Sequence, residues 1–369
     1  MNVPCFIGLM SGTSLDGVDA ALIDFSAKQA RVLATDFAPF DPDLRASLLA
    51  LQSAGGNELE RAALAAGQLA HAYARGVQAV LVAAGVPADA VRAIGAHGQT
   101  VRHRPQAGFT IQLNNPALLA ELTGIPVVAD FRSRDIAAGG QGAPLAPAFH
   151  QAFFAAPGQT RVVLNIGGIA NATVLAADAT VKGFDSGPGN VLMDSWCARH
   201  RGEPFDAGGA WAAGGQVVPA LLECMMSEPY FALPAPKSTG RDLFNPDWLE
   251  RHLAQFPHAT ITPAQDVQAT LVELTALSIC RALAEVDASA VFVCGGGARN
   301  TRLMQRLAEM RPSAQVGDTS SLGIPPDWVE AVAFGWLAKC LVEEMPANLP
   351  AVTGAKGRRL LGAYYPGWP

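Results

Sequence analysis

The chain has 369 residues, of which half are hydrophobic and 16% are charged, and its formal net charge is −6. A chain of this length accommodates two domains with full cores, and this composition excludes an intrinsically disordered protein. The negative charge and the lack of a basic stripe argue against a general affinity for nucleic acid. The densest basic cluster, formed by Lys356, Arg358 and Arg359, is typical of a solvated tail.

The sequence also indicates a cytoplasmic location. The first 12 residues contain no Lys or Arg and reach Gly and Ser after a few apolar residues, unlike a secretory signal. The longest uncharged stretch, 136–160, has too many Gly and Pro residues for a membrane helix. The six cysteines lie far apart without a C-x-x-C pair, which is typical of free thiols in a reducing compartment.

The first half of the chain opens with a predicted hairpin. Apolar strands at 5–10 and 18–25 flank a polar, glycine-rich turn at 11–17, which is too long and too polar to be only a connector. A helix with a regular apolar pattern is predicted at 57–84. The further elements expected here are strands at 93–96, 110–113 and 126–129, and a helix at 117–123 that begins after Pro116.

The second half repeats this opening. Residues 136–147 are the expected crossing point, after which strands at 161–165 and 171–175 again flank a glycine turn. The recurrence is one of organisation rather than of residue identity. The later elements expected are a strand at 181–184, helices at 191–200 and 265–285, a strand at 290–294, and helices from 301 and at 327–344. Alternating strands and helices indicate an α/β protein, with domains expected at 1–145 and 146–369 and a cleft between them.

Several common catalytic motifs are missing from the sequence. Lys237 and the hydroxyl residues after it follow Pro236 rather than the glycine spacing of a phosphate-binding P-loop. No G-x-G-x-x-G follows the first strand, and neither H-E-x-x-H nor G-x-S-x-G occurs. His97 and His103 have no third histidine nearby, which argues against a metal site there.

Three glycine-rich turns follow predicted strands, at 11–14, 165–171 and 295–297. Such turns let backbone N–H groups converge on an anion without obstruction by side chains. Asp16 and Asp19 follow the first turn, and a carboxylate beside phosphate groups is a usual ligand of Mg²⁺. Each turn taken singly is also consistent with an ordinary connection in which Asp and Gly satisfy the geometry. Three such turns in one chain favour a nucleotide site.

Asp185 differs from the other carboxylates because it follows an apolar strand and precedes a Gly-Pro-Gly turn. At a strand end it would project into a cleft, where a carboxylate can act as a general base. The residue type and position suit a helix N-cap or a turn equally well. The local sequence leaves both interpretations open.

Two polar clusters, 97–100 and 130–135, also follow apolar strands and suit a polar or acidic substrate. The two arginines of the second cluster could hold a carboxylate through paired hydrogen bonds or form an inter-domain salt-bridge network. Glu330 lies in the first turn of a predicted helix, where a favourable interaction with the helix dipole is as good an explanation as a role in the cleft.

Nine segments match a known set of motifs in order across almost the whole chain. They are GLMSGTSLDGVD (8–19), GQTVRH (98–103), ADFR (129–132), GGQGAP (139–144), NIGGIAN (165–171), GFDSGPGN (183–190), KSTGR (237–241), CGGG (294–297) and WVEA (328–331). The first and the sixth are long and unusual. Together these segments resemble the anhydro-N-acetylmuramic acid kinases.

The resemblance implies the two-domain α/β fold of actin-like and sugar-kinase ATPases, with an inter-domain cleft. It implies a cytoplasmic kinase that uses ATP and Mg²⁺, acts on a small amino sugar and forms a homodimer, without nucleic-acid or membrane partners. The implied reaction, a step of peptidoglycan recycling, converts 1,6-anhydro-N-acetylmuramic acid, ATP and water to N-acetylmuramic acid 6-phosphate and ADP. Asp185 matches the family's catalytic aspartate, which takes a proton from the water that attacks C1 while O6 receives the γ-phosphoryl group.

The resemblance also assigns binding residues. Thr100, Arg134 and Glu330 match positions of substrate contact, and His97 and Gln99 belong to the same expected substrate group. Asp16 is the expected metal ligand. The residues expected to bind ATP are Gly12, Thr13, Ser14, Leu15, Asp16, Gly17, Val18, Asp19, Gly167, Gly168, Gly295, Gly296 and Gly297.

Three other functions are compatible with parts of this pattern. An ordinary sugar hydroxyl kinase of the same fold would share the glycine turns but would need no water at C1. An actin-like or chaperone-like ATPase would hydrolyse ATP without sugar. A catalytically inactive sugar-binding regulator is disfavoured, because Asp16 and Asp185 are both present.

Overall fold

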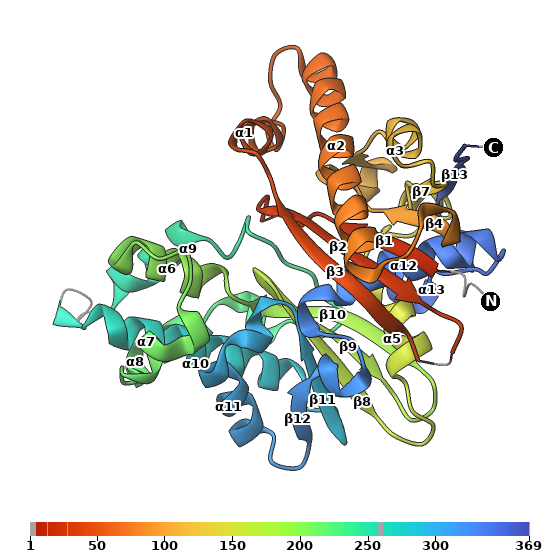
Figure 1. Ribbon diagram of the computed structural model, residues 1–369. Helices are drawn as coiled ribbons and strands as arrows, with labels where there is room; N and C mark the ends of the chain where they lie inside the picture. The colour runs from red at the N-terminus through yellow and green to blue at the C-terminus, as the bar shows by residue number, and fades with distance from the viewer. Residues whose placement is uncertain (1–4, 13, 28, 257–260, 369) are drawn as a thin grey trace. The chain divides into compact units, whose positions relative to one another are not determined.

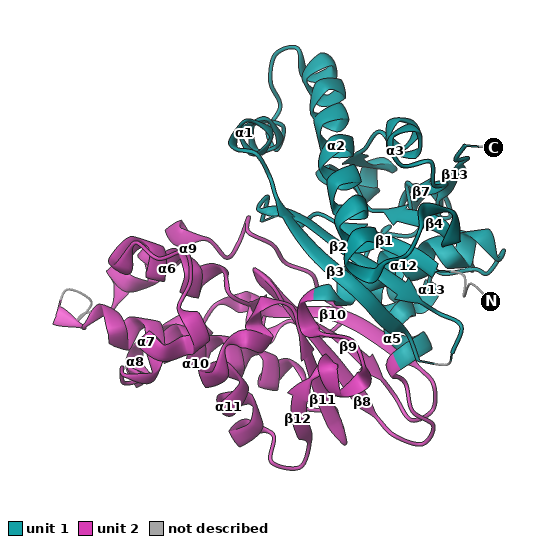
Figure 2. Ribbon diagram, viewed as in Figure 1, with its two compact units in different colours: residues 1–153, 328–369 teal, residues 154–327 magenta. Residues whose placement is uncertain are grey.

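The computed structural model describes residues 5–12, 14–27, 29–256 and 261–368. The chain forms two compact units, shown in separate colours in Figure 2. Unit 1 comprises residues 1–153 and 328–369, and unit 2 comprises residues 154–327. Among the described residues, no helix has both the length and the apolar character needed to cross a membrane.

Unit 1 is built on a six-stranded mixed sheet in the order β13-β7-β4-β1-β2-β3. Its central hairpin pairs β1 antiparallel to β2, while β1 runs parallel to β4 on its other side. The strands are β1 (Cys5–Met10), β2 (Gly17–Asp24), β3 (Arg31–Pro39), β4 (Val91–Ala96), β7 (Val127–Ala129) and β13 (Ala363–Tyr365). A second, two-stranded sheet pairs β5 (Gln99–Arg104) with β6 (Phe109–Leu113).

Helices cover both faces of this sheet. Two of them, α2 and α12, pack on β2, where Gly76 of α2 approaches Ala20 and Gly335 of α12 approaches Ile23. Ala20 and Ile23 lie three positions apart on one strand, so their side chains point to opposite faces. The helices of unit 1 are α1 (Pro42–Ala50), α2 (Glu58–Ala84), α3 (Pro116–Thr123), α4 (Ser133–Ala137), α12 (Val329–Val342) and α13 (Pro350–Thr353), and α5 (Ala146–Phe154) ends at the boundary with unit 2.

Two glycines explain why α12 lies so close to the sheet. A Cβ atom on Gly8 of β1 would overlap the carbonyl oxygen of Ala331, and one on Gly95 of β4 would overlap that of Phe334. Only glycine at these positions lets the helix backbone rest directly on the strands. The C-terminal part of the chain is therefore a layer of unit 1.

Asp135 ties the end of the chain to the same unit. Its Oδ1 accepts hydrogen bonds from Asn348 Nδ2 at 2.7 Å and Thr353 Oγ1 at 2.8 Å, and its Oδ2 accepts one from the Gly142 N–H at 2.8 Å. The side chain is fully buried, and these three donors satisfy both of its oxygens. They join α4, the glycine-rich 139–142 loop and the C-terminal segment.

Unit 2 contains a five-stranded mixed sheet in the order β10-β9-β8-β11-β12. Here β8 pairs antiparallel with β9 and parallel with β11, which is the arrangement of β1, β2 and β4 in unit 1 (Figure 1). The strands are β8 (Arg161–Ile166), β9 (Ile169–Leu175), β10 (Val181–Pro188), β11 (Ala290–Cys294) and β12 (Gln315–Asp318). The helices are α6 (Val191–Arg201), α7 (Ala210–Ala213), α8 (Pro219–Met226), α9 (Pro246–Gln255), α10 (Ala264–Ala282) and α11 (Thr301–Met310).

The α/β class and the repeated strand–turn–strand opening predicted from the sequence are confirmed. The domain division at 145/146 differs from the observed units, since residues 328–369 pack with unit 1 and the first boundary lies after Phe153. The strand expected at 181–184 continues to Pro188, and the helix expected from 327 begins at Val329 after a short 3₁₀ turn. Strands β3, β5, β12 and β13 were not predicted.

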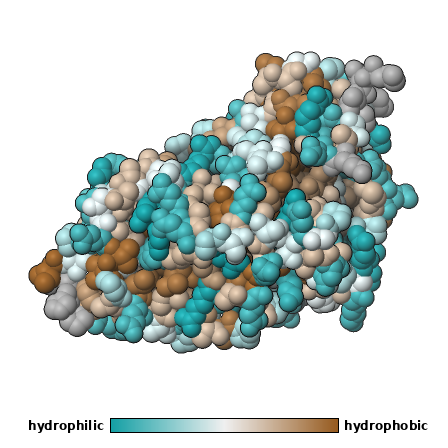
Figure 3. Space-filling view, turned by 90° about the horizontal axis from the view of Figure 1, so that it is seen from below, coloured by the Kyte–Doolittle hydropathy of each residue, from teal (hydrophilic) through white to brown (hydrophobic). Residues whose placement is uncertain are grey.

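The surface shows no broad apolar belt in the view of Figure 3, where small hydrophobic groups are separated by hydrophilic residues. Scattered exposed apolar residues are normal on a folded protein and identify no binding surface.

Candidate active site

Three glycine turns of unit 2 meet at one edge of its sheet. The N–H groups of Gly189 and Asn190, which follow β10, donate to the carbonyl oxygens of Gly168 and Gly167 at 2.9 and 2.7 Å. A Cβ atom on Gly295, after β11, would lie 2.5 Å from Asn165 Oδ1 at the end of β8. The turns after β8, β10 and β11 therefore lie together within unit 2, and two of them, 165–171 and 295–297, are turns singled out from the sequence.

The glycines of these turns fall into two groups. Gly295 has a φ of +75°, and a Cβ atom on Gly297 would overlap the side chain of Ile166, so both are required by the backbone packing. In contrast, a Cβ atom on Gly167 has no neighbour nearer than 3.9 Å, and one on Gly296 would lie 3.4 Å from Asn190 Nδ2. The second group leaves the backbone open to the close approach of a ligand.

A positively charged side chain lies beside the β8–β9 turn. The Arg241 guanidinium is within 3.3 Å of the position a Cβ atom would take on Gly168. Burial raises the pKa of Asp194, in the first turn of α6, to about 7; the Arg241 charge opposes this rise and the Asp206 charge adds to it. Positive charge and open backbone N–H groups together suit a phosphate.

The turn after β1 supplies a comparable feature in unit 1. Gly12 is partly exposed. The atom nearest to a Cβ atom placed there would be Ser14 Oγ, at 3.4 Å. Ser14 Oγ donates to the Asp16 carboxylate, and both residues are exposed. Leu15 holds a left-handed φ of +58° although it is buried, a strain that is concentrated at functional turns.

The other residues of this turn are placed differently. Val18 is fully buried in the core, and Gly17 lies against the backbone of β3, where a Cβ atom would be 2.5 Å from the Ala38 oxygen. The side chains of Leu15 and Val18 are buried in the core and Gly17 has none, so these three residues offer a nucleotide only backbone groups. Asp19 is half-buried, and Thr13 lies outside the described residues.

Asp185 stands within β10, at a β-bulge rather than at the strand end. It pairs with Asn171, and the next paired residue is Gly187 opposite Ala170, so that Ser186 is the extra residue. A bulge bends a strand and changes the direction of its side chains. The strand predicted at 181–184 thus ends four residues later than expected, at Pro188, and Asp185 lies inside it.

The carboxylate of Asp185 is held through one oxygen. Oδ2 accepts hydrogen bonds from Ser238 Oγ and from the Thr239 N–H, both at 3.0 Å, while Oδ1 accepts none from any described residue. The Asp185 N–H donates to Lys237 O at 2.9 Å, and Tyr230 Oη donates to Asp185 O at 2.8 Å. This network orients the side chain and leaves one oxygen for chemistry.

Burial raises the pKa of Asp185, although the hydrogen bonds from Thr239 and Ser238 oppose that rise. Burial also raises the pKa of Tyr230, and the Asp185 charge adds to the effect, so this phenol remains a donor. A carboxylate with a raised pKa and a free oxygen is suited to accept a proton.

In unit 1, His97 and Gln99 are buried at 5% and 0% exposure. Gln99 Nε2 donates to Gly12 O at 3.1 Å, and His97 Nε2 accepts from Arg132 at 2.9 Å. Burial and the Arg132 charge lower the pKa of His97, which is consistent with a neutral imidazole. These two residues connect the loops of unit 1 through Gln99 Nε2 and His97 Nε2. Thr100 is half-buried, and its Oγ1 accepts a hydrogen bond from Gln112 Nε2 at 3.2 Å, so its hydroxyl proton can still be donated.

The two arginines of the 130–135 cluster have different environments. Arg132 donates to His97 and to Gly142 O at 2.9 Å, and burial lowers its pKa to about 10 while the Glu330 charge opposes that shift. Arg134 is exposed, and its guanidinium makes no hydrogen bond to the residues that the structure describes. Arg134 is therefore the member of the pair with free donors, and Glu330 lies close enough to influence Arg132.

Comparison with known proteins decides the family. A model of the family described as anhydro-N-acetylmuramic acid kinase matches residues 4–367. The chain is 55% identical to the anhydro-N-acetylmuramic acid kinase of Pseudomonas putida, over 98% of this chain and 99% of the relative, and 58% identical to that of Bordetella petrii, over 98% and 96%. The chain belongs to the anhydro-N-acetylmuramic acid kinase family.

Solved structures give a more distant likeness. An activator of 2-hydroxyisocaproyl-CoA dehydratase from Clostridium difficile is 12% identical with a TM-score of 0.43, over 92% of this chain and 96% of that one. A ROK family glucokinase from Streptomyces griseus, solved with glucose and AMPPNP, is 15% identical with a TM-score of 0.41, over 91% and 99%. The family membership is carried by the sequence relatives and not by these structures.

Several residues of this anhydro-N-acetylmuramic acid kinase family member have contacts that the sequence did not signal. Ser238 and Thr239 matched a motif, but nothing in their spacing indicated that they hold Asp185. Tyr230 follows a proline in an irregular stretch, and Tyr73 lies within a long amphipathic helix, where an aromatic residue is expected to be part of the core.

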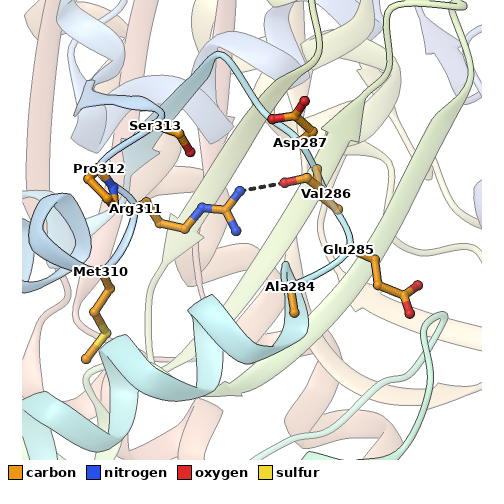
Figure 4. A pocket seen from close by; sticks show the side chains of 8 residues that line it. All are labelled: Ala284, Glu285, Val286, Asp287, Met310, Arg311, Pro312 and Ser313. Atoms are coloured by element: carbon orange, nitrogen blue, oxygen red, sulfur yellow. Dashed lines mark hydrogen bonds between the residues drawn. The ribbon is translucent and has the colours of Figure 1, made fainter.

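A cavity of about 290 Å³ in unit 2 lies away from these turns. It is formed where α10 and α11 end, as Figure 4 shows. Arg311 donates to Leu283 O at 2.8 Å and to Val286 O at 2.6 Å. These bonds connect the residue that follows α11 to the C-cap of α10 and to the loop after it, so the cavity is a feature of how the two helix ends pack.

Proposed function

We propose that this chain converts 1,6-anhydro-N-acetylmuramic acid, ATP and water to N-acetylmuramic acid 6-phosphate and ADP, with Asp185 as the general base. The observation that carries the proposal is the one-sided anchoring of the Asp185 carboxylate. Ser238 and Thr239 hold Oδ2, and Oδ1 remains without a hydrogen bond from the described residues. This arrangement leaves an oriented lone pair for a water proton.

The reaction balances around that oxygen. Asp185 Oδ1 takes a proton from water, whose oxygen forms a bond to C1 as the C1–O6 bond breaks. The electron pair of that bond stays on O6, which then receives the γ-phosphoryl group as ADP leaves. The proton on Asp185 returns to solvent afterwards. The raised pKa of Asp185 makes it a stronger base than an exposed aspartate.

ATP is bound by the open glycine turns in this proposal. Backbone N–H groups at Gly12, Gly167 and Gly296 approach the nucleotide, and Arg241 adds positive charge near Gly168. The required glycines Gly295 and Gly297 shape the β11 turn without touching the ligand.

Mg²⁺ is the further cofactor of the proposed reaction. The exposed Asp16 carboxylate and the adjacent Ser14 hydroxyl offer the hard oxygen donors that Mg²⁺ prefers, with water and phosphate completing its coordination. When bound, Mg²⁺ would neutralise charge on the phosphates of ATP. Among the described residues, no cluster of three or more His, Cys, Asp or Glu side chains offers a fuller metal site.

The sugar is recognised by polar groups of unit 1. Arg134 holds the lactyl carboxylate, because its guanidinium is exposed and has free donors. Thr100 and Glu330 bind hydroxyl or amide groups of the sugar, whereas His97 and Gln99 position the loops. We further propose that the enzyme works in the cytoplasm as a homodimer and binds neither nucleic acid nor membranes.

The proposal is tested with a coupled assay of ADP release on 1,6-anhydro-N-acetylmuramic acid in ¹⁸O-labelled water. We expect sugar-dependent ADP, label at C1 of the product, and a loss of turnover in Asp185→Asn of about three orders of magnitude, because a positioned base contributes on that scale. ADP release without sugar would indicate an ATPase instead. Turnover without label at C1 would indicate an ordinary hydroxyl kinase and would remove the role of Asp185 as the base for water.

A further inference from the structure

A closed ring of three hydrogen bonds lies beneath the glycine turn of unit 1. Tyr73 Oη is 2.9 Å from Ser11 Oγ, Ser11 Oγ is 3.1 Å from Gly98 O, and the Gly98 nitrogen is 3.0 Å from Tyr73 Oη. Tyr73 is 0% exposed and Ser11 is 1% exposed, and Gly98 is buried. The ring is therefore shielded from solvent, and its hydrogen bonds cannot be exchanged for bonds to bulk water.

The direction of each bond in the ring follows from the donors available. The Gly98 carbonyl has no proton, so Ser11 must donate its single hydroxyl proton there. The Gly98 N–H can only donate, so Tyr73 Oη accepts from it. Ser11 has no further proton, and Tyr73 therefore donates to Ser11 Oγ. Burial raises the pKa of Tyr73, which keeps this phenolic proton in place.

The ring joins three separate parts of unit 1. Ser11 follows β1 and precedes the Gly12 turn, Gly98 lies between β4 and β5 next to the strand that carries Thr100, and Tyr73 belongs to α2. A parallel link is formed by Gln99 Nε2, which donates to Gly12 O at 3.1 Å. Gly98 has a φ of +82°, and a Cβ atom there would lie 2.6 Å from Leu113 O, so its backbone has little freedom to adjust.

We propose that Tyr73 is a positioning residue that fixes the Gly12 turn relative to the Gly98–Thr100 segment, and so couples ATP binding to sugar binding. The inference rests on the proposed function, in which Gly12 approaches ATP and Thr100 contacts the sugar. Tyr73 itself touches neither ligand. Its hydroxyl fixes the position of one loop relative to the other. Removing the hydroxyl leaves the Gly98 N–H buried without its acceptor.

The test compares Tyr73→Phe with the wild type in two measurements. Amide hydrogen exchange of the ligand-free protein reports the ring directly, and we expect the Gly98 amide to exchange at least about tenfold faster in the variant. Steady-state kinetics report the coupling, and we expect KM for both ATP and the sugar to rise and kcat/KM to fall about tenfold, the scale of one unsatisfied buried group. Tyr365→Phe, in β13 of the same unit, is the matched control. It should change neither the exchange rate of the Gly98 amide nor the steady-state kinetics.

A second variant keeps the test decisive if Tyr73→Phe folds poorly. Ser11→Ala opens the same ring from the other side, so the double variant should lose less than the sum of the two single losses in kcat/KM. Additive losses, or a lowered Tm with unchanged KM values, would overturn the positioning role and leave a purely structural one. If the wild type shows no sugar-dependent turnover, the proposed function fails, and the Gly98 exchange rate still decides whether Tyr73 fixes the loop.

Discussion

Asp185 and Thr239 are joined across 54 residues by a bond from the Thr239 N–H to Asp185 Oδ2 at 3.0 Å. The Asp185 N–H in turn donates to Lys237 O at 2.9 Å, so that the 237–239 segment holds both the backbone and the side chain of the aspartate. Because the bonds to the carboxylate involve one oxygen, they restrict its rotation without occupying both lone-pair sites. The orientation of the proposed base is thus determined by backbone groups of Lys237 and Thr239 and by the Ser238 hydroxyl.

Replacement of Ser238 by Ala should weaken this control. The variant loses one of the two bonds to Oδ2 that favour the ionised carboxylate, so the pKa of Asp185 should rise further. We expect kcat to fall about tenfold and the acidic limb of the pH–rate profile to move to higher pH, with KM for ATP unchanged. Ser227→Ala is the control, because Ser227 Oγ bonds only to a helix carbonyl, that of Cys224. An unshifted acidic limb would contradict the assigned role.

The raised pKa of Asp185 also predicts the sign of a stability effect. Between the ordinary aspartate pKa and the raised value in the native protein, the unfolded chain binds fewer protons, so stability falls as the pH rises through this window. Asp185→Asn removes that loss. The difference in Tm between the variant and the wild type should therefore be more positive at pH 7 than at pH 4.

Asp24 provides a control of opposite sign. Burial acts to raise the pKa of Asp24, but the bonds from Ser26 and Arg31 together outweigh it and lower the pKa. Its contribution to stability is therefore present above the ordinary aspartate pKa and is lost as the pH falls. Asp24→Asn should then destabilise the protein more at pH 7 than at pH 4. The same direction of change in both variants would contradict the assignment of a raised pKa to Asp185.

The two kinds of glycine in the β11 turn predict different effects of the same substitution. A Cβ atom on Gly296 meets only Asn190 Nδ2, at 3.4 Å, whereas one on Gly297 overlaps Ile166. Gly296→Ala should raise KM for ATP about tenfold with little change in Tm. Gly297→Ala should lower the free energy of unfolding by about 1–3 kcal/mol, the cost of overpacking, and so lower Tm. Kinetics and thermal unfolding of both variants check this. A normal KM for ATP in Gly296→Ala would remove that turn from the nucleotide site.

Much of the fold could be predicted from the sequence because the patterns that indicate its strands and helices are local. The β1–β2 and β8–β9 hairpins were predicted from short apolar runs on either side of glycine, and α2 and α10 from long periodic patterns. The return of α12 to unit 1 was not readable, because it depends on Gly8 and Gly95 lying under a helix more than 230 residues later in the chain. A glycine in a strand indicates a close approach, but it does not identify the element that approaches.

The candidate site was predictable to a similar extent. Glycine turns at strand ends and the carboxylate at 185 carry a chemical signal in their residue types. In contrast, the burial of His97 and Gln99 depends on which loops pack over them, and the difference between Arg132 and Arg134 depends on the direction of two side chains in neighbouring positions. Residue type alone assigned all four to the same polar surface.

That difference between the arginines gives a final prediction. Arg134→Gln should raise KM for the anhydro sugar about tenfold or more, because a charge-assisted bond to the lactyl carboxylate is lost, while Tm stays unchanged at an exposed position. Arg132→Gln should instead lower Tm, since it removes bonds to His97 and to Gly142 O inside unit 1. The decisive comparison uses 1,6-anhydro-N-acetylglucosamine, which lacks the carboxylate. KM for this analogue should be the same in Arg134→Gln as in the wild type, and an equal loss with both sugars would mean that Arg134 does not recognise the carboxylate.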